Sequence, residues 1–178
     1  MAGPSGTNQF ELVELGALSL SDWTHLVRGD PAPFGPVHEA IEFRAKDHHV
    51  GLRDQDGRLV AACGVTVVTV EVERNEPFEV AGVGALIVRK EMRGQGLAAI
   101  VMPRTTALVD RLGPDRAMLF AETALMKVYM RFGYRPITSP VWVDQPSGPL
   151  QMPLNALWRP IVPTTWPDGP VRVHGLPF

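Results

Sequence analysis

Two glycines, Gly94 and Gly96, separate a basic stretch from an apolar run that favours a helix. The basic stretch covers residues 89–93, and residues 97–101 follow the second glycine directly. Glycines at the start of a helix allow backbone N–H groups to approach a phosphate, and the positive end of the helix dipole attracts the anion. The spacing therefore predicts a phosphate-binding loop.

Two common classes of phosphate loop fit this stretch poorly. A nucleoside triphosphate loop needs Lys-Ser or Lys-Thr after its last glycine, whereas Leu-Ala follows Gly96 here. A dinucleotide loop fits better, because residues 94–99 read Gly-x-Gly-x-x-Ala and Glu122 could bind a ribose. However, five mostly charged residues precede Gly94, and too little chain follows Phe132 for the further strand–helix units of that fold.

Coenzyme A is the ligand that the residues favour. Its pyrophosphate could bind the N–H groups at the helix start, while Arg89, Lys90 and Arg93 neutralise its charge. Residues 93–98, Arg-Gly-Gln-Gly-Leu-Ala, resemble the loop Arg/Gln-x-x-Gly-x-Gly/Ala of the GNAT acetyltransferase superfamily. Residues 129–134, Tyr-Met-Arg-Phe-Gly-Tyr, resemble a second motif of that family, Tyr-x-x-x-Gly-Phe/Tyr, at the expected separation of one strand.

The resemblance implies a mixed α/β (α+β) fold, with a mostly antiparallel sheet of about six or seven strands flanked by about four helices. It implies that the fourth and fifth strands splay apart and that pantetheine inserts between them along the backbone of Leu86, Ile87 and Val88. Acetyl-CoA is the implied cosubstrate. The implied coenzyme loop consists of Arg93, Gly94, Gln95, Gly96, Leu97 and Ala98.

The resemblance also implies catalytic roles. Tyr129 matches the family's tyrosine that protonates the departing thiolate, a role for which a phenol is a competent acid. Some members carry a glutamate midway along the fourth strand as a general base, but residues 82–84 read Gly-Val-Gly here. Glu79 and Glu122 are the substitutes that the sequence offers, and a water relay or an acceptor that arrives neutral is an alternative.

The function expected from these motifs is transfer of acetyl from acetyl-CoA to a primary amine by direct attack, with a small molecule as the favoured acceptor. Residues 30–46 and 138–155, including Trp142, are expected to form the acceptor side. Amino sugars, peptide N-termini and lysine side chains stay open as acceptors. A non-catalytic module that binds acyl-CoA as a sensor is the alternative function.

Hydrophobic alternation and turn residues predict the elements that must position these groups. Strands are expected over residues 10–15, 48–53, 59–73, 78–88, 117–121, 134–144 and 150–154. Helices are expected over residues 21–28, 37–45 and 95–112, and a fourth along the apolar stripe Leu125, Val128, Tyr129 and Phe132. Pro103 is expected to kink or break the third of these helices. Residues 1–178 are expected to form one domain, with 1–8 as a loose N-terminus and 159–178 as an extended tail that packs on the sheet or across a partner in a homodimer.

Composition excludes several classes of function. The 178 residues carry a net charge of −2, which disfavours nucleic acid as a partner. The longest near-apolar run, residues 59–70, is too short and too β-branched to span a bilayer, so no membrane role is expected. The single cysteine, Cys63, predicts a small core residue and a cytoplasmic location, and no cluster of histidines and cysteines suggests a metal site.

Overall fold

The computed structural model describes residues 9–178, so the expected loose N-terminus at residues 1–8 lies outside the described residues. Ten strands form one sheet, in which β4 and β5 pair in parallel, as do β7 and β10, and all other pairs are antiparallel. The strands are β1 (Glu11–Leu15), β2 (His48–Arg53), β3 (Leu59–Val72), β4 (Phe78–Val88), β5 (Arg116–Ala121), β6 (Arg135–Pro136), β7 (Val141–Gln145), β8 (Gly148–Gln151), β9 (Asn155–Pro160) and β10 (Val171–Val173). The α-helices are α1 (Leu20–Leu26), α2 (Pro36–Glu39), α3 (Leu97–Val109) and α4 (Met126–Met130).

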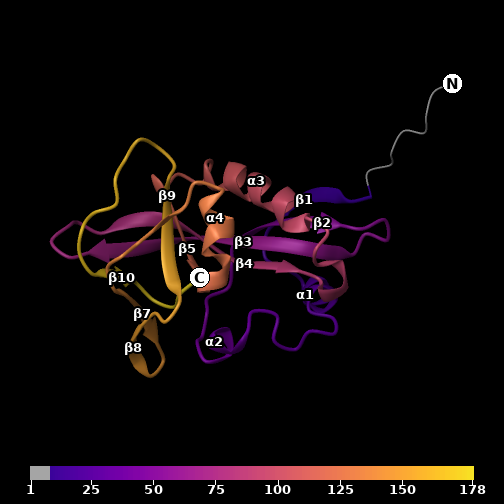
Figure 1. Cartoon of the computed structure of the whole chain (residues 1–178), viewed down its shortest axis with the longest axis horizontal. Coiled ribbons are helices and arrows are strands. Elements are labelled where there is room, and N and C mark those ends of the chain that lie inside the picture. The colour runs from indigo at the N-terminus through magenta and orange to yellow at the C-terminus, as the bar shows by residue number, and fades with distance from the viewer. Residues whose placement is uncertain (1–8) are drawn as a thin grey trace.

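The helices cover opposite faces of the sheet, with α3 and α4 on one side and α1 and α2 on the other (Figure 1). The alternation along β5 shows this division, because successive side chains of a strand point to opposite faces. Leu119 packs in the same cluster as Val101 and Met102 of α3. Phe120, the next residue, packs in a second cluster with Ile41 and Phe178 on the opposite face. This mixed, mostly antiparallel sheet with four α-helices in residues 9–178 confirms the expected fold class.

The number of strands was underestimated, because ten are present where six or seven were expected. The single strand expected over residues 134–144 is divided into β6 and β7, with Pro140 directly before the second. The strand expected over 150–154 is replaced by β8 and β9, which Pro153 separates. Proline has no backbone N–H and fixes its own φ, so it interrupts a hydrogen-bonded ladder at such points.

Two helix predictions were wrong in part. The helix expected over residues 37–45 is the single turn α2, Pro36–Glu39. The expected apolar stripe on α4 is also incomplete, because Leu125 is 47% exposed and Val128 is 36% exposed. Sequence periodicity cannot distinguish a buried stripe from one that faces a groove, and only Tyr129 of this turn is buried. Pro103 lies inside α3 without ending it.

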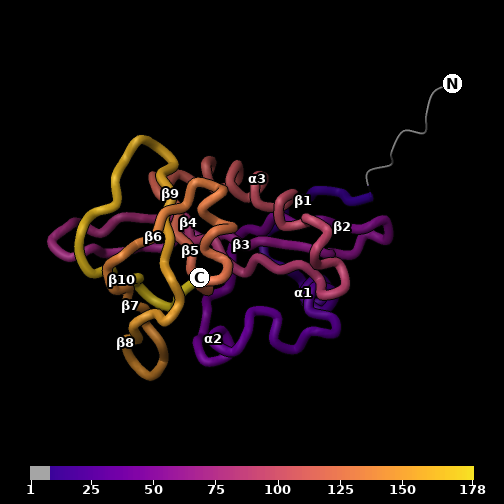
Figure 2. Tube along the Cα trace, viewed as in Figure 1, coloured from indigo at the N-terminus to yellow at the C-terminus, as the bar shows by residue number. Residues whose placement is uncertain are grey.

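Residues 161–178 do not stay outside the sheet. β10 pairs antiparallel with the end of β3, from Val171 opposite Val72 to Val173 opposite Val70. It also pairs in parallel with β7, so it joins β3 to the β7–β8 hairpin. The chain then returns to the middle of the molecule, where it ends near β5 (Figure 2). The alternation of buried Val171, exposed Arg172 and buried Val173 explains why a short strand forms here.

Phe178 anchors this returning segment. Its side chain is only 2% exposed, and its ring lies 5.0 Å from the ring of Phe120 on β5. Gly82 of β4 makes room for it, because a Cβ at that position would lie 2.5 Å from the Phe178 ring. The packing therefore requires both the aromatic ring and the missing side chain.

We expect Phe178→Leu to lower the free energy of unfolding by about 1 kcal/mol, because leucine replaces most of the volume but not the aromatic pair with Phe120. Thermal denaturation should show a decrease of the melting temperature of about 2–4 °C. Val162→Thr is the matched control, since Val162 lies in the same segment but is 42% exposed. Equal melting temperatures for the wild type and Phe178→Leu would contradict this packing.

Candidate functional site

The parallel strands β4 and β5 separate partway along their length. Their pairing runs from Ala81 opposite Ala117 to Val83 opposite Leu119 and stops there, although β4 continues to Val88. Within residues 9–178 no strand pairs with the β5-facing edge of β4 beyond Val83. The splay that the resemblance implied is therefore present, and it leaves the β5-facing backbone groups of residues 84–87 without a partner strand in the described part of the chain.

A bulge accompanies the separation. The register between β3 and β4 shifts between Ala62 and Gly64, and Ala85 has a positive φ of 51°. A bulge bends a strand and re-aims the residues around it. Here it lies where β4 leaves β5, so the bend and the divergence coincide.

A cavity of about 240 Å³ lies at this divergence. Residues from both faces of the sheet line it. They come from α2 and the segment before it, from the bulged part of β4, from the end of β5, and from α4 and the turn before it. Its lining consists of Pro33, Phe34, Gly35, His38, Gly84, Ala85, Leu86, Phe120, Ala121, Glu122, Leu125 and Tyr129. The cavity thus connects the side of α4 with the side of α2 through the gap between the two strands.

Of the three expected catalytic residues, Tyr129 and Glu122 line this cavity and Glu79 does not. Glu79 lies exposed near the start of β4, paired with Thr69 of β3, where β4 and β5 have not yet separated. The structure therefore places the expected acid and one of the two expected substitute bases in the lining of one cavity.

The ring of Tyr129 is held in place from the side of α4. It is 9% exposed, and it packs edge-on against Tyr134 with 6.3 Å between ring centroids. Burial raises the pKa of the Tyr129 hydroxyl above its usual value near 10. The hydroxyl consequently stays protonated at neutral and mildly alkaline pH, which is the state that a proton donor needs.

Glu122 follows β5 directly and lies against the loop before α2. Its Oε1 atom is 3.2 Å from the point where a Cβ on Gly35 would lie, and Gly35 has a φ of +79°. Both the close approach and the left-handed backbone favour glycine at that position. The carboxylate is half-buried at the edge of the cavity.

His38 is a cavity residue that the sequence did not reveal. Its ring stacks on Phe43 at 4.8 Å and lies 5.3 Å from Phe34. Its Nδ1 atom is buried without a hydrogen-bond partner in the described part of the chain. A lone histidine after a proline-rich stretch gives no periodic or motif signal, so only the folded loop identifies it.

A second, largely apolar cavity of about 330 Å³ adjoins the first and shares Phe34 and Ala85 with it. Its other apolar walls come from Leu18, Trp23, Phe43 and Ile87. Lys46 and His49 also line it. Lys46 is 8% exposed, and burial lowers the pKa of its ammonium to about 8. Residues between 33 and 46 therefore line both cavities, and their role as the acceptor side stays a prediction.

The glycine loop connects the end of β4 to the start of α3, so it follows the part of β4 that has separated from β5. Gly94 and Gly96 have φ values of +79° and +77°, and Gly96 is the N-cap of α3 without a side-chain hydrogen bond. Apart from the adjacent residues of the chain, no atom of residues 9–178 lies within 4 Å of a Cβ built on either glycine. The first N–H groups of a helix have no partner within it. The loop therefore presents open backbone donors from residues 97 and 98, as expected.

The side chain of Arg93 is bonded to two other residues of the protein. Its Nε donates to the Val88 carbonyl at 3.0 Å, and its guanidinium forms an ion pair with Asp30. The arginine thus ties the glycine loop to the end of β4 and to the segment that leads into α2. A role in neutralising a phosphate stays a prediction.

The Gly-Val-Gly stretch at residues 82–84 is explained by close packing. A Cβ on Gly84 would lie 2.9 Å from the main-chain carbonyl carbon of Phe178 and 3.2 Å from Cε of Lys46. A glutamate at residue 82 or 84 would therefore collide with the returning C-terminal segment. The packing of this segment leaves no room for a strand carboxylate at either position.

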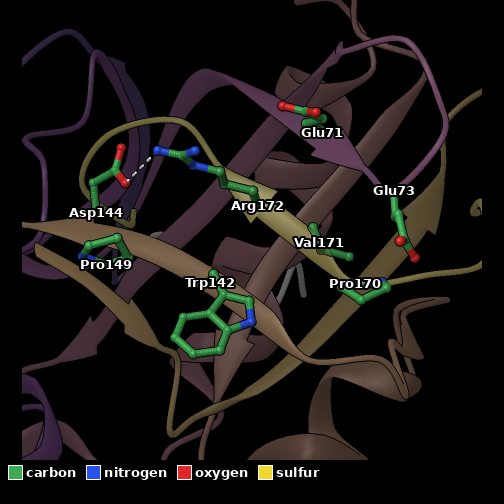
Figure 3. A pocket seen from close by; sticks show the side chains of 8 residues that line it. All are labelled: Glu71, Glu73, Trp142, Asp144, Pro149, Pro170, Val171 and Arg172. Carbon is green, nitrogen blue, oxygen red and sulfur yellow. Dashed lines mark hydrogen bonds and ion pairs between the residues drawn. The ribbon is translucent and has the colours of Figure 1, made fainter.

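Another hollow, of about 360 Å³, lies at the far end of the sheet and shares no residue with the cavity at the divergence. Figure 3 shows Trp142, Glu71 and Glu73 around it, with Arg172 and Asp144 joined by an ion pair of 3.3 Å. It contains neither Tyr129 nor the glycine loop. Trp142 therefore does not lie in the cavity lined by Tyr129.

The described residues contain no group of three or more histidine, cysteine, aspartate and glutamate side chains that could hold a metal ion. No helix between residues 9 and 178 is both long and apolar enough to cross a membrane.

A family model for the acetyltransferase (GNAT) domain matches residues 30–137, which is more than half of the chain. The protein therefore belongs to the GNAT acetyltransferase family. No curated protein sequence matches it.

Solved structures of this family resemble the chain. It is similar to the GNAT family N-acetyltransferase YhbS from Escherichia coli in complex with CoA, with a TM-score of 0.60, 15% identity, and coverage of 98% of this chain and 93% of that one. It is also similar to Escherichia coli ElaA, with a TM-score of 0.57, 22% identity, and coverage of 84% and 99%. An acyl-CoA N-acyltransferase from Pseudomonas aeruginosa gives a TM-score of 0.56, 21% identity, and coverage of 84% and 99%. At these identities the likeness shows the fold.

Proposed function

We propose that this protein transfers acetyl from acetyl-CoA to the primary amine of a small molecule by direct attack. The observation that carries the proposal is the cavity at the separation of β4 and β5, which Tyr129 lines, together with the glycine loop to which the separated part of β4 leads. YhbS, which has this fold, is described in complex with CoA.

In this proposal, three parts of acetyl-CoA would contact the described residues. The pyrophosphate would bind the N–H groups at the start of α3, next to Gly94 and Gly96. The pantetheine amides would pair with the β5-facing edge of Leu86, Ile87 and Val88, where the Val88 carbonyl also accepts from Nε of Arg93. The thioester would then lie in the cavity, within reach of the Tyr129 hydroxyl.

The reaction needs two proton transfers. The amine lone pair forms the new C–N bond at the thioester carbonyl, the C–S bond breaks, and the thiolate takes the proton of the Tyr129 hydroxyl. The amine loses a proton to a base or to water. The Tyr129 hydroxyl is protonated at neutral pH, as the first transfer requires, while burial raises its pKa and so makes it a weaker acid than a free phenol.

The adjoining apolar cavity favours acceptors with an apolar body. Trp23, Phe34 and Ile87 offer a hydrophobic surface to whatever group carries the amine. Such a surface discriminates between acceptors by burial of their apolar area. We therefore infer that the acceptor is an amine with an aliphatic or aromatic group close to the reacting nitrogen.

An amine screen tests this function. Each acceptor is incubated with acetyl-CoA, and the release of free CoA thiol is followed with a thiol reagent. Cys63 should not disturb the assay, because it is fully buried and its thiol pKa is raised to about 12. Phenethylamine should give a kcat/KM at least about 10-fold above that of ethanolamine. Glucosamine, a peptide N-terminus and a lysine-containing peptide cover the other acceptor classes.

The non-catalytic alternative makes a different prediction in the same experiment. An acyl-CoA sensor would show a raised melting temperature with acetyl-CoA but no acceptor-dependent release of thiol. A protein that neither releases thiol nor gains stability from acetyl-CoA would contradict both functions.

A further inference from the structure

We propose that His38 is the general base that takes the proton from the acceptor amine. The proposal rests on the proposed acetyl transfer, for which the strand glutamate of other family members is missing at Gly82 and Gly84. His38 is the one histidine among the residues that line the cavity, and it enters from the opposite side of the sheet to Tyr129. Base and acid would thus act from opposite sides of the reacting carbon.

The position of the His38 ring is fixed by stacking. The ring lies parallel to Phe43, with an interplanar angle of 15°, and next to Phe34. Its Nδ1 atom is buried without a hydrogen-bond partner within residues 9–178. Because Nδ1 is buried, an acceptor in the cavity could contact the imidazole only through its other ring nitrogen, Nε2.

The surroundings of His38 keep the imidazole neutral. Burial lowers its pKa below the ordinary value of 6.5, and the charge of Lys46 acts in the same direction. The carboxylate of Glu122 and the Phe34 carbonyl oppose this shift. A neutral imidazole can accept a proton at pH 7, and Glu122 would stabilise the imidazolium that forms.

The proton transfers then balance. The ammonium of the acceptor gives one proton to His38, and the resulting amine attacks the carbonyl of the thioester. Tyr129 gives its proton to the thiolate as the C–S bond breaks. The nitrogen of the new C–N bond loses its second proton, which restores the Tyr129 hydroxyl, and His38 releases its proton to water before the next turnover. Glu122 is a positioning residue in this scheme.

The pH dependence of kcat/KM tests the role of His38, with an acceptor whose amine has a pKa near 10. His38→Gln should lower kcat/KM by about 10- to 100-fold at pH 7. Without this base, the variant can use only acceptor molecules whose amine is already neutral. Its kcat/KM should therefore rise about tenfold per pH unit between pH 7 and pH 9. The wild type, whose base is neutral throughout this range, should change much less.

Three comparisons make the result decisive. His174→Gln, at a half-exposed histidine paired with Glu71, should match the wild type at every pH. Acetyl-CoA should raise the melting temperature of His38→Gln as much as that of the wild type, which shows an intact coenzyme site. The proposal would be overturned if kcat/KM rose steeply with pH in Glu122→Gln while His38→Gln kept the pH dependence of the wild type. Glu122 would then be the general base.

The outcome also separates this inference from the proposed function. If the wild type acetylates an amine and a folded His38→Gln protein does so equally well at pH 7, only the role of His38 is lost. If the wild type acetylates none of the amines, acetyl transfer is contradicted and the role of His38 with it.

Discussion

Tyr129→Phe is expected to lower kcat by about 10- to 1,000-fold while the affinity for acetyl-CoA stays near that of the wild type. The substitution removes only the hydroxyl, so the ring still packs edge-on against Tyr134. Without this donor the thiolate must leave without a proton from the protein. The measurement is steady-state turnover with the best acceptor of the amine screen, together with the melting temperature with and without acetyl-CoA.

The pH dependence of the wild type gives a second test of Tyr129. Burial raises the pKa of its hydroxyl above 10, so the donor stays protonated as the pH rises. At pH values up to about 9, turnover should therefore not decrease through loss of this proton. A purely structural tyrosine would behave differently on substitution. Loss of a buried hydrogen bond would lower stability by about 1 kcal/mol and leave turnover unchanged. Wild-type turnover by folded Tyr129→Phe would remove the assignment.

Gly96→Asp is expected to weaken binding of acetyl-CoA far more than Gly96→Asn does. Both side chains tolerate the left-handed backbone, here at a φ of +77°, better than other residues, and they have nearly the same shape. Only the aspartate adds a negative charge at the N-terminus of α3, where the pyrophosphate would bind. Two charges about 4 Å apart interact with about 1–4 kcal/mol at a protein surface, which corresponds to a difference of about 10- to 1,000-fold.

The ligand-induced change in melting temperature measures this effect independently of any loss of stability. Acetyl-CoA should raise the melting temperature of the wild type strongly, that of Gly96→Asn less, and that of Gly96→Asp hardly at all. Equal shifts for the two variants would indicate that the pyrophosphate binds elsewhere. Stabilisation by NAD in place of acetyl-CoA would favour the dinucleotide interpretation of the same glycines.

Local sequence predicted the parts of the site that depend on neighbouring residues. The glycine loop is such a part, because the backbone of Gly94 and Gly96 and the start of α3 are set within a few residues of each other. Tyr129 could be located for a similar reason, since its distance from Gly133 and Tyr134 is fixed by one helical turn. The sheet class also followed from alternation within single strands.

Short strands and single turns were predicted less well. β6 and β10 contain two and three residues, and such segments have too little periodicity to be recognised before they pair. α2 is one turn within a loop, so its histidine had no pattern around it. These elements form because of what they pack against.

The sequence by itself determined the conformation of the glycine loop and the position of the tyrosine motif, because each arises from contacts between residues close in the chain. Alternation within single strands indicated the mixed sheet, although its parallel pair of β4 and β5 joins residues far apart in the chain. Tertiary structure alone decided which groups share the cavity. It brought His38 and Glu122, from segments far apart in sequence, to the place where β4 leaves β5. It also placed Phe178 against Gly82 and Gly84, which leaves no room for a strand carboxylate at either position. Such contacts depend on how the whole sheet closes, and no local periodicity records them.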